Sequence, residues 1–135
     1  MGKPIQDIEG IGPAYGEKLA TAGIKSTDDL LEKGCTAKGR KEIAQQCELS
    51  EKQVLGWVNM ADLFRIKGVA GEFAELLECS GVDTVKELAQ RNADNLAAKM
   101  AEVNEEKKLT RRVPTPSQVA DWISQAAELP RKVEY

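Results

Sequence analysis

The predicted fold is decided by the stretch Ile8-Glu9-Gly10-Ile11-Gly12-Pro13-Ala14-Tyr15-Gly16-Glu17-Lys18-Leu19, in which two glycines flank one apolar residue. The same pattern returns further along the chain, where Gly68-Val69-Ala70 aligns with Gly10-Ile11-Gly12. The register then holds without a gap, so that Leu30 still aligns with Leu88. The chain therefore contains one unit written twice.

Each copy of this unit carries the same signals for ending one helix and starting another. Gly23 and Gly81 stand where a helix is expected to end, because glycine enters the left-handed cap conformation without a Cβ penalty. Ser26 and Thr84 follow, and such hydroxyls accept a hydrogen bond from an otherwise unpaired amide at a helix start. The pattern predicts a helical hairpin in each copy.

A second matched segment closes each copy. Ser50-Glu51-Lys52-Gln53 aligns with Thr115-Pro116-Ser117-Gln118, and Trp57 then aligns with Trp122. Both segments predict a capped closing helix, whose tryptophan we interpret as a core anchor. Because the offset is larger here, the second copy must contain an insertion. We place it at Glu105 to Pro114, a charged stretch that we expect to be an exposed loop.

These signals predict an all-α protein made of two tandem helical repeats, residues 1–60 and 61–135, that pack into one compact unit. The composition agrees, because aromatic residues make up only 4% of the chain and strands favour aromatic and β-branched residues. The segment from Asn59 to Ile66 lacks glycine and proline, so the first closing helix is predicted to run into the second hairpin.

The composition also limits the functions that we expect. The sequence has no histidine, no nucleophile beside a plausible base and no glycine-rich loop for a nucleotide, so we expect no catalysis, no cofactor and no metal. Cys35, Cys47 and Cys79 lack metal-ligand spacing and are interpreted as buried thiols in a reducing cytoplasm. Apolar runs are too short to cross a bilayer, so we expect no membrane partner. The net charge of -3 argues mildly against a ligand held by phosphate contacts.

The quoted stretch nevertheless resembles the helix-hairpin-helix motif, and the resemblance covers most of both repeats. In that family, amides at the start of a helix cradle a phosphate, and DNA is bound without its sequence being read. The resemblance implies a nucleic-acid site at Gly10, Ile11, Gly12, Ala14, Tyr15 and Lys18, with Ile11 as the apolar plug between helices.

This sequence departs from the motif in its charges. Active hairpins carry Lys or Arg in the first turn after the second glycine, where this chain has Ala14 and Glu17. The second hairpin is followed by Glu72, Glu75 and Glu78, which would repel a phosphate. We therefore expect the second hairpin to be structural or to meet a cationic partner.

Two basic runs are candidates for the missing positive charge. We expect Lys38, Arg40 and Lys41 to assist the first hairpin. A secondary basic patch lies in the inserted loop at Lys107, Lys108, Arg111 and Arg112. The alternative is that each run is a solvated surface balanced by neighbouring glutamates.

The segment from Ile43 to Trp57 also resembles a helix-turn-helix, which would present Lys52, Gln53 and Asn59 to base edges. Glu48 stands where that motif prefers glycine. Two packed helices joined by a short turn are, moreover, common in helical bundles.

The whole chain resembles an uncharacterised bacterial family, catalogued as domain of unknown function number 4332, that contains helix-hairpin-helix repeats. The strings Gly71-Glu72-Phe73-Ala74-Glu75-Leu76-Leu77-Glu78 and Gln118-Val119-Ala120-Asp121-Trp122-Ile123 carry this resemblance. It implies the fold and offers no activity. Our main hypothesis is sequence-independent binding of nucleic-acid backbone through the first hairpin. The alternative is a protein-interaction or scaffold module with structural hairpins only.

Overall fold

The computed structural model describes residues 4–8, 11–69, 71–130 and 132–133, and its regular structure there is helical. A single isolated β-bridge joins Pro4 and Ser26 in these ranges. The prediction of an all-α fold is therefore confirmed. The elements are the 3-10 turn η1 (Ile5–Asp7) and the helices α1 (Pro13–Thr21), α2 (Thr27–Gly34), α3 (Ala37–Cys47), α4 (Glu51–Leu63), α5 (Gly71–Cys79), α6 (Val85–Ala89), α7 (Ala93–Lys107) and α8 (Pro116–Glu128).

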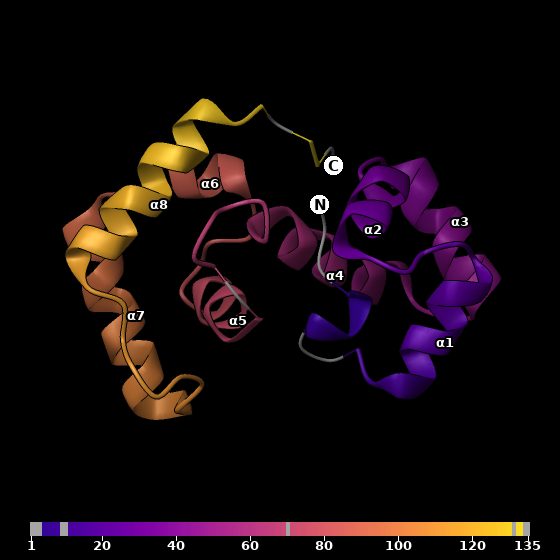
Figure 1. Cartoon of the computed structure of the whole chain (residues 1–135), viewed down its shortest axis with the longest axis horizontal. Coiled ribbons are helices and arrows are strands. Elements are labelled where there is room, and N and C mark those ends of the chain that lie inside the picture. Colours follow the sequence, from indigo (N-terminus) through magenta and orange to yellow (C-terminus); the bar gives the residue numbers. More distant parts are fainter. Residues whose placement is uncertain (1–3, 9–10, 70, 131, 134–135) are drawn as a thin grey trace.

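The helices form two groups that share one core (Figure 1). In the first group α2, α3 and α4 pack on one another and α1 packs on α3, while in the second group α6 and α7 pack on α8. Helix α5 contacts α4 on one side and α7 on the other, and so joins the groups. Buried apolar side chains of both groups form one continuous cluster, which confirms a compact unit.

Local signals in the sequence explain where the helices begin. The hydroxyls of Ser26 and Thr84 accept hydrogen bonds from the amides three residues later, at 3.2 Å and 3.3 Å. Thr115 and Gln118 form a reciprocal capping box at the start of α8, where Pro116 occupies the first helical position. All of these caps were predicted, because a cap depends on residues that are close in the sequence.

The same local geometry occurs in both groups at positions 58 residues apart. Gly23 and Gly81 adopt left-handed φ angles of 82° and 93°, as predicted, two residues past the ends of α1 and α5. The next amide in each copy donates to a carbonyl five residues earlier, at 2.9 Å in both cases. This bond pairs the last carbonyls of each helix, which would otherwise lack a partner.

Each group also contains one tilted aromatic pair. The rings of Tyr15 and Trp57 lie 5.3 Å apart at 59°, and those of Phe73 and Trp122 lie 5.4 Å apart at 54°. Both tryptophans are buried, as expected of core anchors. The first pair joins α1 to α4 and the second joins α5 to α8, and each adds a favourable ring contact to the buried area.

Helix α4 reaches the second hairpin through tight turns and, contrary to our expectation, does not continue as helix through Ile66. It ends at Leu63, and the chain continues in tight turns in which amides donate to carbonyls three residues earlier, as from Arg65 to Asp62 at 3.1 Å. The chain makes the same turns around η1, as from Asp7 to Pro4 at 3.0 Å. Such turns need neither glycine nor proline, so the sequence carries no signal for them.

Helix α7 extends through Lys107, so the first three residues of the stretch that we expected to be a loop are helical. Lys108 then adopts the left-handed conformation with φ of 52° and ends the helix. Pro114 is buried, and Leu109 and Thr110 are half-buried. The loop therefore packs on the helical body over part of its length.

Candidate nucleic-acid interface

The turn before α1 is anchored by apolar side chains. Ile8 and Ile11 are both buried, and the amide of Ile11 donates to the carbonyl of Ile8 at 3.1 Å. Ile11 is only 3% exposed, so its side chain lies in the core and cannot itself contact a ligand. Gly10, which belongs to the predicted site, lies outside the described residues.

The amino end of α1 offers main-chain amides to solvent. The first helical hydrogen bond runs from Gly16 to the carbonyl of Gly12 at 2.9 Å, so the amides of Ala14 and Tyr15 precede the helical ladder. Pro13 has no N–H group. The helix has neither a side-chain cap nor an acidic residue in its first turn. The first turn of α1 therefore supplies no carboxylate to the positive end of the helix dipole.

Gly12 has open space around it. Its φ of -86° and ψ of -174° are accessible to any residue, so the turn does not require glycine at this position. A Cβ added to Gly12 would meet no heavy atom within 4 Å. A larger side chain at Gly12 would therefore extend into this space without a clash at its Cβ.

The structure does not add the predicted positive charge to this end of α1. Arg40 is only 5% exposed, and its Nη1 donates to the carbonyl of Gly34 at 2.9 Å. The guanidinium therefore pairs with the last carbonyl of α2 and, being buried, is not available to a phosphate, contrary to our expectation. Arginine commonly takes this role at a helix end, because it donates to unpaired carbonyls and opposes the helix dipole.

Lys38 and Lys41 are exposed, but they lie near the opposite end of α1. The thiol of Cys47, at the end of α3, donates to the carbonyl of Lys18 in the last turn of α1 at 3.3 Å. Gly39, near the start of α3, lines a hollow together with Ala22, which follows α1. The first turn of α3 therefore lies beyond the carboxyl end of α1, away from Gly12. Lys18 is exposed near that same end.

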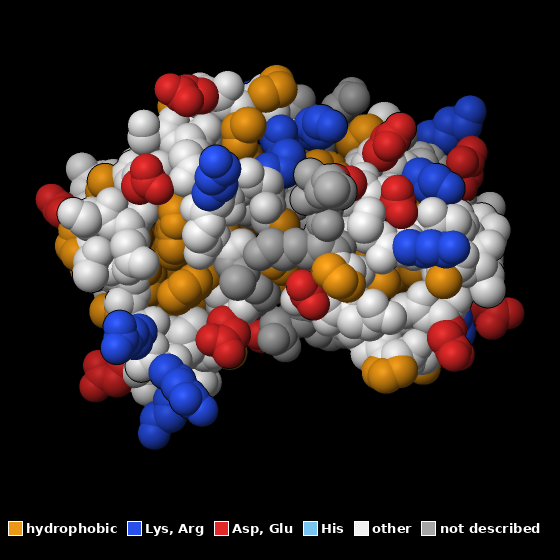
Figure 2. All heavy atoms as spheres, in the orientation of Figure 1, with side chains coloured by type: hydrophobic (Ala, Val, Ile, Leu, Met, Phe, Trp, Pro, Cys, Tyr) orange, Lys and Arg blue, Asp and Glu red, His pale blue; other side chains and the backbone are white. Residues whose placement is uncertain are grey.

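The secondary basic patch is fully presented at the surface. Figure 2 shows basic side chains gathered at the lower left of the molecule, over the end of α7. Lys107, Lys108, Arg111 and Arg112 are all exposed. None of the four forms an ion pair with a residue that the structure describes. We call residues 107–113, which also include the exposed Val113, the basic loop.

The second hairpin carries negative charge instead. Glu72 lies exposed in the first turn of α5, and Glu78 lies exposed near its end. Partial burial raises the pKa of Glu78, and the neighbouring Asp83 and Glu75 raise it further. Glu78 also borders a groove of about 410 Å³ that is lined by Trp57 and Met60. This helix start is unsuited to a phosphate.

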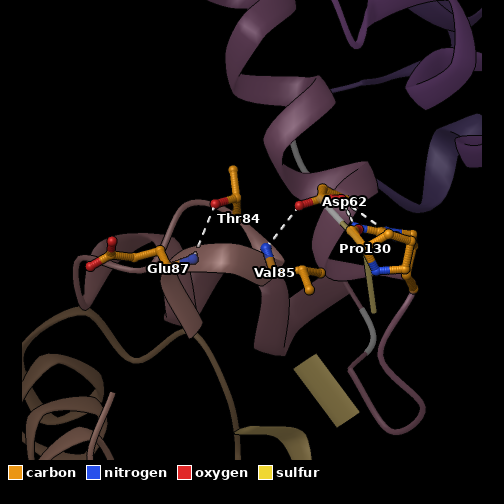
Figure 3. Close-up of polar contacts among 6 residues, drawn as sticks. Asp62, Thr84, Val85, Glu87 and Pro130 are labelled. Atoms are coloured by element: carbon orange, nitrogen blue, oxygen red, sulfur yellow. Dashed lines mark hydrogen bonds and ion pairs between the residues drawn. The ribbon is translucent and has the colours of Figure 1, made fainter. Parts of the chain in front are cut away.

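The sequence reading missed a buried polar cluster between the two groups (Figure 3). Asp62 is 1% exposed, and its carboxylate pairs with Arg65 at 2.7 Å and accepts the amide of Val85 at 2.8 Å. Arg65 also donates to the carbonyl of Pro130 at 2.9 Å. The spacing of Asp62 and Arg65 within an apolar segment was the available signal, since such residues face one another on a helical turn.

Two further expectations fail. Asn59 is buried, so α4 does not present it to a base edge as the helix-turn-helix hypothesis required. Among the cysteines, only Cys47 is buried, while Cys35 is half-buried and Cys79 is exposed at the end of α5. Both failures have one cause. Whether a helical residue is buried depends on where the neighbouring helices pack, and the sequence alone does not determine this.

Within the described ranges, no helix is long and apolar enough to cross a membrane. The same part of the chain contains no cluster of side chains suited to a metal ion. The sequence model of a family described as a domain of unknown function (DUF4332) matches residues 9–129. Comparisons with curated proteins and with solved structures give no significant match.

Proposed function

The chain belongs to the family described as a domain of unknown function (DUF4332), and we propose that it is a non-enzymatic module that binds nucleic-acid backbone through the start of α1. The observation that carries this proposal is the uncapped amino end of α1 beside the open space at Gly12. Free amides and the positive end of the helix dipole together favour a phosphate oxygen. Phosphate contacts carry no base information, so the binding is sequence-independent.

The proposal treats η1 with α1, and the end of α4 with α5, as two helix-hairpin-helix elements. It is supported by the tight turns and apolar plugs that occur in both copies, where Ile11 and Val69 are buried at equivalent positions. Only the first copy is assigned a ligand, since Glu72 places a carboxylate in the first turn of the second.

Substitution of Gly12 tests the proposal directly. We expect Gly12→Leu to fold normally, because the position has an ordinary φ and open space, and to lose binding, because the side chain fills the approach to the amides. Gly56→Leu is the matched control, since a Cβ at Gly56 also meets nothing within 4 Å. Binding is measured by fluorescence anisotropy of labelled DNA and RNA at low and near-physiological salt, and folding by thermal unfolding.

The outcomes are clear in both directions. Salt-sensitive binding by the parent protein and the Gly56→Leu variant, with loss in Gly12→Leu, supports the proposal, because phosphate binding weakens as counterions compete. A folded Gly12→Leu variant that binds like the parent protein overturns the assignment to α1. Absence of binding by the parent protein at low salt overturns the function itself, since electrostatic attraction is strongest there.

A protein-interaction module is the second candidate, and the acidic surface of α5 favours it. Glu72 and Glu78 are exposed on this helix, and Glu78 borders the groove beside Trp57. A cationic partner segment would be attracted to this surface. Failure of every nucleic acid to bind at low salt, together with intact folding, would leave this candidate as the better account of the structure.

A further inference from the structure

The basic loop is held in a defined conformation. Asn104 is buried, its Nδ2 donates to the carbonyl of Thr110 at 3.0 Å, and its Oδ1 accepts the amide of Thr110 at 2.9 Å. The hydroxyl of Thr110 then donates to the carbonyl of Arg112 at 2.7 Å. The main chain around the two arginines is thus fixed before any ligand arrives. Binding by an ordered loop loses less conformational entropy than binding by a mobile one.

The chemistry of this loop is suited to phosphate groups. Arg111 and Arg112 are exposed, and a guanidinium binds two phosphate oxygens at once with well-directed hydrogen bonds. The loop contains no aromatic side chain on which a base could stack. Lys107 and Lys108 add two further positive charges beside the arginines. The contacts available are therefore to a charged backbone.

The basic loop and the start of α1 belong to different helix groups. Helix α1 packs on η1 and α3, whereas α7, which leads into the loop, packs on α5 and α8. In Figure 1 the first turn of α1 and the loop after α7 both lie at the lower edge of the molecule, with α5 between them. One small phosphate can occupy only one of these places, whereas a polymer can reach both.

We propose that the basic loop is a second phosphate-binding site and that the ligand is a nucleic-acid polymer long enough to contact both the loop and the start of α1. This inference rests on the proposed function and extends it. The loop adds four exposed cations to the one lysine, Lys18, that α1 itself carries. It also predicts that affinity depends on ligand length, because a short oligonucleotide cannot reach both sites.

The test compares two variants that remove equal charge. Arg111→Gln combined with Arg112→Gln removes two loop cations, and Lys38→Gln combined with Lys41→Gln removes two exposed cations from α3. Each lost phosphate contact on duplex DNA lowers the slope of log affinity against log salt by about 0.9, so the arginine variant is expected to lose about 1.8. The lysine variant is expected to keep the slope of the parent protein.

Duplexes of increasing length are titrated with the parent protein and both variants. We expect the affinity of the parent protein and the lysine variant to rise with length, and that of the arginine variant to stop rising early. An unchanged slope and length dependence in the arginine variant would overturn the second site while leaving the function of α1 intact. Vesicles containing phosphatidylserine are titrated in parallel. Arginine-dependent binding to the vesicles, without binding to DNA, would identify lipid phosphate as the ligand and overturn the inference.

Discussion

At the scale of single residues, surroundings decide what a charge can do. Arg40 and Arg111 are chemically identical and both stand in basic runs of the sequence. The guanidinium of Arg40 is buried against the end of α2, whereas that of Arg111 is exposed on an ordered loop. The sequence predicted both runs as candidates but could not separate them, because the difference depends on the face of α3 that packs against α2.

Asn104 allows a test of how much the loop conformation matters. Asn104→Ala keeps every charge but leaves both main-chain groups of Thr110 without their partner, so we expect a loss of about 1–3 kcal/mol in the free energy of unfolding. Binding to long duplex DNA should weaken less than in the double arginine variant, because the four cations remain. Asn95→Ala, at an exposed position of the same helix, is the control. Equal stability of the two variants in urea would show that the bonds to Thr110 contribute little.

Glu78 gives a prediction for pH. Its pKa is raised in the folded protein above the ordinary value of 4.5, so the ionised carboxyl is less favourable when folded than when unfolded. Glu78→Gln should therefore stabilise the protein at pH 7, by less than about 1 kcal/mol because the residue is exposed. This advantage should shrink as the pH falls below the raised pKa and vanish below 4.5, where both states are protonated.

Glu72→Gln removes the same charge from the same helix and is the matched control. Glu72 lies at the start of α5, where a carboxylate is attracted to the positive end of the helix dipole, so its replacement should not stabilise the protein. Thermal unfolding of both variants between pH 3 and pH 8 measures the difference. A pH-independent gain in the Glu78→Gln variant would show that ionisation of this carboxyl is not the cause.

At the scale of helices, the sequence predicted what local chemistry controls. The caps at Ser26, Thr84 and Thr115 and the left-handed glycines were all identified, because their signals lie within a few residues of the helix ends. The end of α4 was missed, since a tight turn has no residue signature. The position of Lys38 relative to Gly12 was missed as well. It depends on how α3 packs against α1, and periodicity within one helix does not determine this.

Gly39 illustrates such a packing requirement. A Cβ at this position would overlap the carbonyl oxygen of Lys33 in α2. We expect Gly39→Ala to destabilise the protein by about 1–3 kcal/mol, because main-chain atoms would have to move apart. Gly12→Ala is the control and should change stability by no more than about 0.5 kcal/mol, since its Cβ meets open space. Similar urea midpoints for the two variants would contradict the close approach of α2 and α3.

At the scale of the whole molecule, the two helix groups are held together by apolar and polar contacts. The apolar cluster is continuous from Ile5 to Val133. The cluster around Asp62 adds directed contacts, since the carboxylate lies at the end of α4, accepts an amide at the start of α6 and pairs with Arg65, which reaches Pro130. The sequence predicted one compact unit but not this junction, whose partners come from segments far apart in the chain.

Asp62→Asn should therefore destabilise the entire molecule. In asparagine an NH2 group replaces one carboxylate oxygen and cannot accept a hydrogen bond, so either Arg65 or the amide of Val85 loses its acceptor. Breaking a buried ion pair costs about 3–5 kcal/mol. Glu87→Gln is the control, because its pair with Arg91 is only half-buried and contributes at most about 1 kcal/mol.

Urea unfolding is followed by tryptophan fluorescence in Trp57→Phe and Trp122→Phe backgrounds, so that each helix group is observed separately. Because the core is continuous, Asp62→Asn should lower the midpoint of both groups equally. A lowered midpoint in one group alone would mean that the groups unfold independently and that Asp62 stabilises only one of them.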